Sequence, residues 1–265
     1  MGHPRGEEKQ NKEHPHAEEL QKVASAEPSG EELDPSLRGE AALIPPGWRP
    51  VYRNPLQAPG NVAGFVLEGD GAATFPLGRL RLESTRSPEE GQKANIVFWC
   101  PEEFPADHAV SWSFRPLHEP GLAILFFAAA GSCGRDLFDP GLPQRTGEYD
   151  QYHHGEMNAL HISYFRRMWA SERSFHTCNL RKSYGFHLVA QGADPLPGVL
   201  DMTEPYRMLL VKQGPDVTFA VNGLPVLRWR DDGRAYGPLL ASGRIGFRQM
   251  APLIAEYSDL SVYAP

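Results

Sequence analysis

The sequence has few cysteines and no long apolar run. Its three cysteines, Cys100, Cys133 and Cys178, are too few and too widely spaced for a disulfide framework or a zinc motif. The N-terminus has no apolar segment typical of a secretory signal. The longest apolar run, residues 122–130, is about half of the roughly 18 residues that a membrane-spanning helix needs. These absences predict a cytoplasmic protein with reduced thiols and no membrane partner.

The sequence also lacks an excess of basic residues. The net charge is −7, and residues 1–40 contain ten acidic and five basic residues, which leaves a charge of −2 for the rest of the chain. A nucleic-acid surface needs clustered Lys and Arg to neutralise phosphates, so we expect no nucleic-acid partner. Residues 1–40 have almost no large apolar side chains and are predicted to be a disordered acidic tail. The globular domain is then expected over residues 41–265.

No segment indicates a long helix. The 26 glycines and 25 prolines break helices and favour turns, and apolar residues alternate with polar ones in many short segments between turn signals. This pattern predicts an all-β protein, a jelly-roll β-sandwich of two packed antiparallel sheets. The expected strands are 61–68, 79–84, 95–100, 108–114, 121–130, 158–167, 185–191, 206–212, 217–221, 224–229, 243–248 and 255–263.

Polar, aromatic and basic residues are concentrated between residues 147 and 185. Within this stretch, residues 158–167 alternate in a way that predicts a strand, because β-branched and aromatic residues are frequent and no apolar stripe follows helical spacing. Leu160, Ile162 and Tyr164 then share one face, and His161, Ser163, Phe165 and Arg167 share the other. One face is typical of a core and the other of a binding site.

Four blocks of sequence resemble a known family. They are residues 161–164 (HISY), 178–183 (CNLRKS), 191–197 (QGADPLP) and 246–252 (GFRQMAP), and together they resemble the YesU-like family, which is defined as a domain of unknown function. The resemblance covers roughly residues 41–265 and implies the concanavalin-A-like jelly-roll fold. It also implies a link to the breakdown of acidic or plant-type polysaccharides, with the ligand across the concave face of one sheet.

These considerations predict an oligosaccharide site without a metal or other cofactor. We expect an acidic, uronate-containing sugar, cleaved by lyase-type β-elimination, in which Arg or Asn neutralises the carboxylate and His or Tyr transfers the proton. The predicted catalytic residues are His161, Tyr164 and Arg181. The predicted substrate-binding residues are Tyr152, His153, Asn158, Ser163, Arg167, Asn179, Lys182, Arg248 and Gln249; Tyr149, Tyr152 or Trp169 would stack on a pyranose ring.

Three alternatives stay open at this point. A non-catalytic carbohydrate-binding module would use the same groove without a proton-transfer pair. A glycoside hydrolase would need two carboxylates, for which Asp150 and Glu156 are the nearest candidates. A metal site could draw on His153, His154, Glu156 and His161, whose side chains are suitable ligands. The sequence does not specify an oligomeric state.

Overall fold

Fifteen strands form two antiparallel sheets in the part of the chain that the structure describes. The structure is a computed structural model, and it describes residues 1–2 and 35–265. The first sheet (sheet A) has the order β13 (Leu224–Arg230), β12 (Asp216–Val221), β11 (Tyr206–Gln213), β6 (His108–His118), β15 (Ile254–Ala264), β4 (Leu80–Ser84) and β3 (Gly71–Thr74), and β1 (Arg49–Asn54) also pairs with β15.

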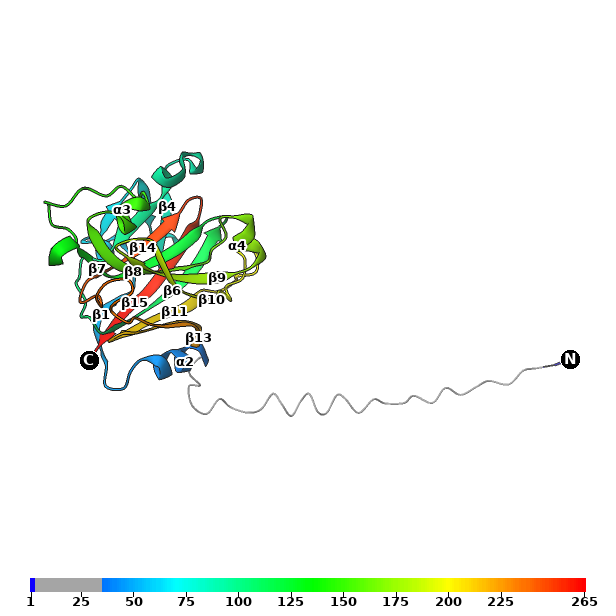
Figure 1. Cartoon of the computed structure of the whole chain (residues 1–265). Helices are drawn as coiled ribbons and strands as arrows, with labels where there is room; N and C mark the ends of the chain where they lie inside the picture. Colours follow the sequence, from blue (N-terminus) through cyan, green and yellow to red (C-terminus); the bar gives the residue numbers. More distant parts are fainter. Residues whose placement is uncertain (3–34) are drawn as a thin grey trace. The chain divides into compact units, whose positions relative to one another are not determined.

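The second sheet (sheet B) carries the candidate site. Its order is β10 (His187–Ala193), β9 (Thr177–Ser183), β8 (Met157–Tyr164), β7 (Leu122–Gly131), β14 (Arg244–Met250), β5 (Ile96–Trp99) and β2 (Val66–Glu68). The helices are short: α2 (Pro35–Leu43), α3 (Asp150–His153), α4 (Ala170–Ser174) and four 3₁₀ segments, Pro59–Val62, Pro76–Gly78, Pro88–Ala94 and Ser132–Gly134. The predicted all-β sandwich of two antiparallel sheets is confirmed (Figure 1).

The main core lies between the two sheets. Alternate residues of the central strands meet there, among them Trp112, Leu160, Ile162, Leu180 and Phe247, and all of them are fully buried. This packing follows from the period of two in a strand, since every second side chain points to the same face. The intervening residues of sheet B therefore point away from the core.

Part of the outer face of sheet A is covered by the chain itself. Leu43, Ile44 and Trp48, in and after helix α2, pack against a small apolar cluster on this face. Glu40 of the same helix pairs with Arg207 through two contacts of 3.0 Å. On the outer face of sheet B, Leu137 and Tyr152 cover one part, and a groove lies over another part.

Helix α2 also changes the expected start of the folded part. Residues 35–40 were assigned to the tail, but they belong to this helix, which Glu40 fastens to the sandwich. The other tail residues, 3–34, lie outside the described residues. Three strands are absent from the predicted set. Strand β1 has prolines around it that indicate turns, and β3 has a GAAT sequence with little apolar alternation. Strand β9 (Thr177–Ser183) is the third.

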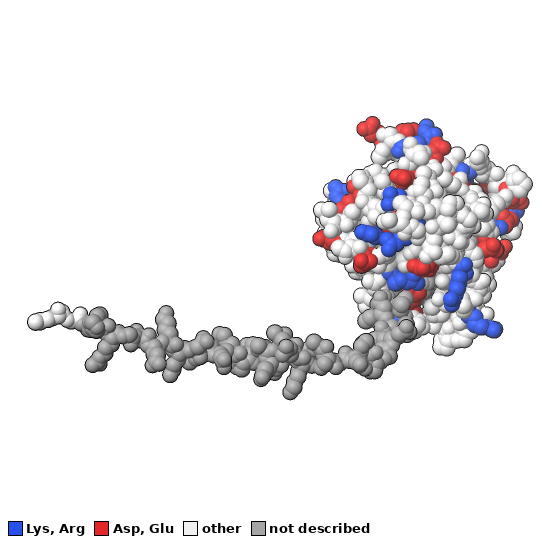
Figure 2. Space-filling view, turned by 180° about the vertical axis from the view of Figure 1, so that it is seen from behind, with Lys and Arg blue, Asp and Glu red and all other residues white. Residues whose placement is uncertain are grey.

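Several other expectations can be compared with the structure. The three cysteines are free. The longest helix among the described residues has nine residues, far fewer than the roughly 20 needed to cross a bilayer. On the face shown in Figure 2, basic and acidic side chains are interspersed, without a large patch of one sign.

Candidate functional site

A row of cross-strand neighbours runs over the outer face of sheet B. Arg248 of β14 is paired with Ile124 of β7, which is paired with Ser163 of β8. Ser163 is paired in turn with Asn179 of β9, and Asn179 with Gln191 of β10. Neighbouring strands are about 4.8 Å apart, so the row crosses most of the sheet. Arg248, Ser163 and Asn179, three predicted site residues from distant parts of the sequence, therefore lie in one cross-strand row.

A second row lies beside the first. His161 of β8 is paired with Phe126 of β7 on one side and with Arg181 of β9 on the other. Both rows point away from the sandwich core, because they hold the strand positions that alternate with core residues. The structure therefore brings together five predicted site residues: His161, Ser163, Asn179, Arg181 and Arg248.

Over these rows lies an open groove of about 170 Å³. Ser163, Asn179 and Arg248 line it together with apolar residues of β7 and β14, and Trp169 and Phe186 are large aromatic side chains of its lining. Trp169 is 52% exposed and Phe186 is 44% exposed. Exposed aromatic rings beside polar groups suit the flat face and the hydroxyls of a sugar.

Arg248 is a buried cation without an anionic partner. Its side chain is fully buried, and no carboxylate among the described residues lies within ion-pair distance of it. Its Nη2 makes two long contacts of 3.3 Å, to Gln92 Oε1 and to the carbonyl oxygen of Gly147, and its Nε and Nη1 have no partner. The guanidinium lies 4.4 Å from the centre of the Tyr149 ring. Burial lowers the pKa of Arg248, and an anion in the groove would offset this cost.

Arg181 provides a second cation. Its guanidinium stacks 3.7 Å from the centre of the Phe186 ring and donates one hydrogen bond of 3.0 Å to the carbonyl oxygen of Phe186. No ion pair with a described carboxylate is formed. Its pKa is lowered by partial burial. Stacking fixes the plane of the guanidinium and leaves donors for an oxygen-rich ligand.

Tyr149 links the groove to His161. The Tyr149 hydroxyl lies 2.8 Å from His161 Nε2, and the imidazole is fully buried behind it. Burial raises the pKa of Tyr149 to about 12 and holds the pKa of His161 well below its ordinary value. The imidazole is therefore neutral near pH 7, and its Nε2 shares a hydrogen bond with the Tyr149 hydroxyl. The sequence indicated Tyr149 only as a stacking residue.

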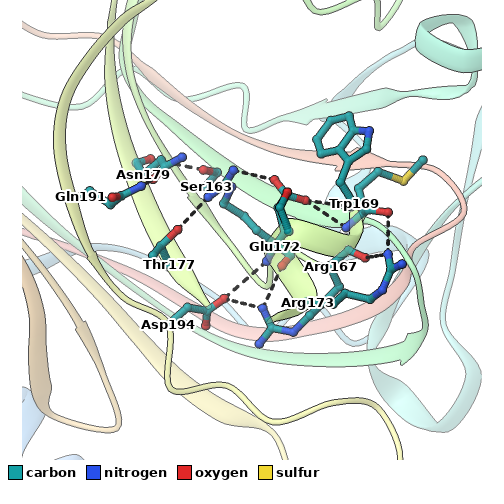
Figure 3. Close-up of polar contacts among 12 residues, drawn as sticks. Ser163, Arg167, Trp169, Glu172, Arg173, Thr177, Asn179, Gln191 and Asp194 are labelled. Carbon is teal, nitrogen blue, oxygen red and sulfur yellow. Dashed lines mark hydrogen bonds and ion pairs between the residues drawn. The ribbon is translucent and has the colours of Figure 1, made fainter. Parts of the chain in front are cut away.

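Sequence reasoning missed Arg166 and Glu172, which also line the groove. Glu172 pairs with Arg166 at 2.5 Å, and its other oxygen accepts hydrogen bonds from the backbone N–H groups of Met168 and Trp169 (Figure 3). Arg166 also donates to Thr177 at 2.8 Å. These contacts fix the loop that carries Trp169. A signal was present, since Glu172 follows Trp169 by three residues, the spacing of a helix-capping carboxylate.

Three predicted site residues must be removed from the site because they point into the sandwich. Tyr164 is part of the main core, and Gln249 donates to the Tyr257 hydroxyl at 3.0 Å. Lys182 forms a buried ion pair with Asp231 at 2.6 Å. Each of these three residues is adjacent in its strand to an outward-facing residue. Successive side chains of a strand point to opposite faces, so each of the three points inward.

Arg167 is also removed, for a different reason. The backbone of Phe165 has a φ of 47°, which ends the alternation after β8 and turns its ring into the core. Arg167 then pairs with buried Asp194 at 3.0 Å (Figure 3). It also donates to the carbonyl oxygen of Leu196. Its charge is neutralised within the protein.

The remaining three predicted binding residues do not line the groove. Asn158 borders a separate cavity, next to the irregular pairing of β7 with β8. Tyr152 is buried in α3 and donates to Glu68 at 2.8 Å. His153 packs with ring centres 4.8 Å from Tyr149 and 4.6 Å from Phe186. None of the three lines the groove, and His153 supports two side chains that do.

The buried imidazole of His161 predicts a pH-dependent stability. The unfolded chain protonates this histidine below its ordinary pKa of about 6.5, whereas the folded protein keeps it neutral, so stability falls as the pH drops below that value. Each such histidine contributes a slope of up to about 1.4 kcal/mol per pH unit. Urea unfolding at several pH values between 7 and 5 measures the free energy of unfolding. Its slope against pH should be shallower for His161→Gln than for the wild type.

The control for this experiment is His176→Gln. His176 is exposed, and its Nε2 lies 3.0 Å from the carbonyl oxygen of Arg173. Its replacement should leave the slope unchanged. Equal slopes for wild type and His161→Gln would show that His161 is not held neutral by the fold. Burial lowers the pKa values of His108 and His153 to about 4, so these two residues contribute to the pH dependence of the unfolding free energy in every variant.

The two-sheet sandwich has a galectin-like fold, as a solved relative of this chain shows. A crystal structure of a Bacillus subtilis protein of unknown function with a galectin-like fold shares 52% identity and a TM-score of 0.78, over 82% of this chain and 97% of that one. Two more distant solved structures share the fold. One is the potassium-bound carbohydrate recognition domain of Emp46p, with a TM-score of 0.52 and 12% identity over 82% of this chain and 98% of that one. The other is lectin UEA-II complexed with galactose, with a TM-score of 0.51 and 10% identity over 80% of this chain and 96% of that one.

The chain belongs to the family described as domain of unknown function DUF1961, whose profile matches residues 49–262. It is 54% identical over 213 residues to the uncharacterized protein YesU of Bacillus subtilis (strain 168). The matched region covers 80% of this chain and 94% of that protein. The family resemblance read from the four sequence blocks is therefore confirmed.

Proposed function

We propose that the protein binds an acidic saccharide in the groove on the outer face of sheet B. The observation that carries this proposal is the pair of guanidinium groups, Arg181 and Arg248, that have no carboxylate partner among the described residues. A uronate carboxylate would accept charge-assisted hydrogen bonds from Arg248. Trp169 would stack on the sugar ring, and the Ser163 hydroxyl and the Asn179 amide would meet sugar hydroxyls.

The fold supports this proposal independently of the charges. Solved structures that share it include proteins described as a carbohydrate recognition domain and as a lectin complexed with galactose. The fold and the neutral part of the groove would suit any sugar. We propose a uronate because the two cations of the groove would bind its carboxylate.

A second candidate function, β-elimination, is favoured by the hydrogen bond between Tyr149 and His161. With the carboxylate on Arg248, the neighbouring C5–H of the uronate becomes more acidic. The Tyr149 oxygen would take that proton and pass its phenol proton to His161. As the C4–O bond breaks and a C4–C5 double bond forms, Tyr149 would give the proton taken from C5 to the leaving oxygen, and His161 would return the phenol proton to Tyr149. Tyr149 thus takes the role predicted for Tyr164, and His161 acts through it.

The hydrolase alternative has little support. Glu172 is the one carboxylate that lines the groove among the described residues, and its oxygens are occupied by Arg166 and two backbone N–H groups. Asp150 and Glu156 border a different cleft. A pair of carboxylates on both sides of a sugar bond is therefore missing from the described part of the groove.

Isothermal titration with oligouronates, their methyl esters and neutral oligosaccharides tests the proposal. The ester is a matched ligand, because it has nearly the same shape without the charge. We expect the free uronate to bind at least about tenfold more tightly than its ester, as loss of a charge-assisted hydrogen bond would give. Equal binding of acid and ester, or no binding of any uronate, would contradict the proposal.

Product analysis of the same mixtures separates binding from elimination. An unsaturated uronate, detected by ultraviolet absorbance and by mass, would establish a lyase, and Tyr149→Phe should then abolish turnover while binding is kept. Binding without any product would leave the lectin-like function standing and refute the elimination.

A further inference from the structure

Three ligand-type side chains converge beside the groove, at the end of helix α3. His154 Nδ1 lies 3.0 Å from Asp150 Oδ1 and 2.9 Å from His153 Nδ1. His153 Nδ1 is 3.9 Å from the same carboxylate oxygen. All three ligand atoms lie within 4.8 Å of one another. The sequence suggested His153 and His154 as metal ligands, but it did not suggest Asp150.

Protons alone do not explain this arrangement well. If His154 Nδ1 carries a proton, that proton can point at the carboxylate or at His153, but not straight at both. If His154 Nδ1 carries none, its lone pair faces the carboxylate oxygen at 3.0 Å, and two acceptor atoms then face each other without a proton between them. A cation among the three atoms would turn all of these contacts into attractive ones.

We propose that Asp150, His153 and His154 bind a divalent transition metal ion of the zinc class. Two imidazole nitrogens and one carboxylate oxygen are the donor set that such ions take in sites with an open position. The short helix accounts for the geometry, since residues 150, 153 and 154 lie on one face at spacings of three and four. The protein offers three ligands, so water or a ligand oxygen would complete the coordination.

Two of the three proposed ligands, Asp150 and His154, line a cleft that shares no lining residue with the saccharide groove. This cleft has a volume of about 400 Å³, and its lining includes Asp150, His154, Glu156 and Tyr184. The Asp150 side chain is 81% exposed and the His154 side chain is 46% exposed, whereas His153 is largely buried. An ion can therefore enter from solvent, and His153 anchors it to the fold.

Two residues that the sequence suggested as ligands are excluded from this set. His161 has its Nε2 on the Tyr149 hydroxyl, and Glu156 pairs with Arg135 at 2.5 Å. The proposed site is nonetheless coupled to the groove by packing, because the His153 ring contacts both Tyr149 and Phe186. A bound ion would hold α3, and with it Tyr149, in place.

Zinc titration of the full chain tests the proposal. The sequence also has His3, His14 and His16 near its N-terminus, so these three are first replaced by glutamine to remove competing ligands. We expect this background to bind one Zn²⁺ per chain. His154→Gln and Asp150→Asn, both at exposed positions, should each weaken binding by about tenfold or more, because even the loss of a supporting contact has that effect.

His176→Gln is the matched control, since it removes an exposed histidine outside the cluster and should leave the zinc affinity unchanged. Cobalt substitution gives a second readout, as an ion held by the three ligands shows intense d–d absorption that His154→Gln should lose. The proposal is overturned if the background binds no zinc, or if His154→Gln and Asp150→Asn bind it as the background does. The test needs no saccharide, so its outcome is independent of the function proposed above.

Discussion

Arg248→Met is expected to abolish the binding of acidic saccharides and to leave the protein at least as stable as the wild type. Arg248 is fully buried, and its Nε and Nη1 atoms have no partner. Methionine fills a similar volume without a charge, and replacing an uncompensated buried charge by an apolar side chain is usually neutral or stabilising. The ligand carboxylate would lose its charged partner, which costs about 2–5 kcal/mol, or about 30-fold or more in affinity.

The opposite signs of the two effects make this prediction specific. Titration with an oligouronate measures the affinity, and urea unfolding without ligand measures the stability. Arg244→Met is the matched control, because Arg244 lies on the same strand but pairs with Asp136 outside the groove. It should keep the affinity. An Arg248→Met protein that binds the oligouronate normally would refute the assigned role of Arg248, and one that unfolds much more easily would show that Arg248 serves the fold.

Lys182→Met is expected to destabilise the fold by about 3–5 kcal/mol, because it leaves one buried charge without its partner. Lys182 is 1% exposed and lies 2.6 Å from Asp231, which is 5% exposed. The ammonium also donates to the carbonyl oxygens of Gly237 and Pro238. The sequence placed Lys182 in the binding site, so the two interpretations predict different losses: stability in one case and saccharide affinity in the other.

Urea unfolding of a double-mutant cycle checks this second prediction. Lys182→Met with Asp231→Asn should recover part of the loss, since no unpaired charge then remains. The adjacent exposed pair of Arg230 with Asp216, at 2.7 Å, is the control, and Arg230→Met should cost less than about 1 kcal/mol. A stable Lys182→Met protein that binds saccharide weakly would support the original assignment to the site.

The sequence was a good guide to strands and a partial guide to faces. Alternation in β8 separated Ile162 from His161 and Ser163 correctly, because a strand has a period of two whatever its neighbours are. The same rule applied to β9 and β14 would have turned Lys182 and Gln249 inward. The chemistry of these side chains suggested a site, and the alternation that contradicted this was given less weight.

Other outcomes depended on contacts between distant parts of the chain. Asp231 follows Lys182 by 49 residues, and the sequence does not indicate that the two meet. The left-handed backbone of Phe165 sends Arg167 to Asp194, and a loop brings Tyr149 to His161. Helix α2 packs on part of the outer face of sheet A. Each of these contacts requires the folded arrangement of segments that are far apart in sequence.

By itself, the sequence determined the all-β class, the family and most of the polar residues on the outer face of sheet B. These properties depend on local alternation and on turn residues, which act within a few positions of the chain. Only the tertiary structure decided which charges are neutralised internally and which are left for a ligand. Charge pairing depends on distance in space, so it separated Lys182 and Arg167, which have buried partners, from Arg181 and Arg248, which have none.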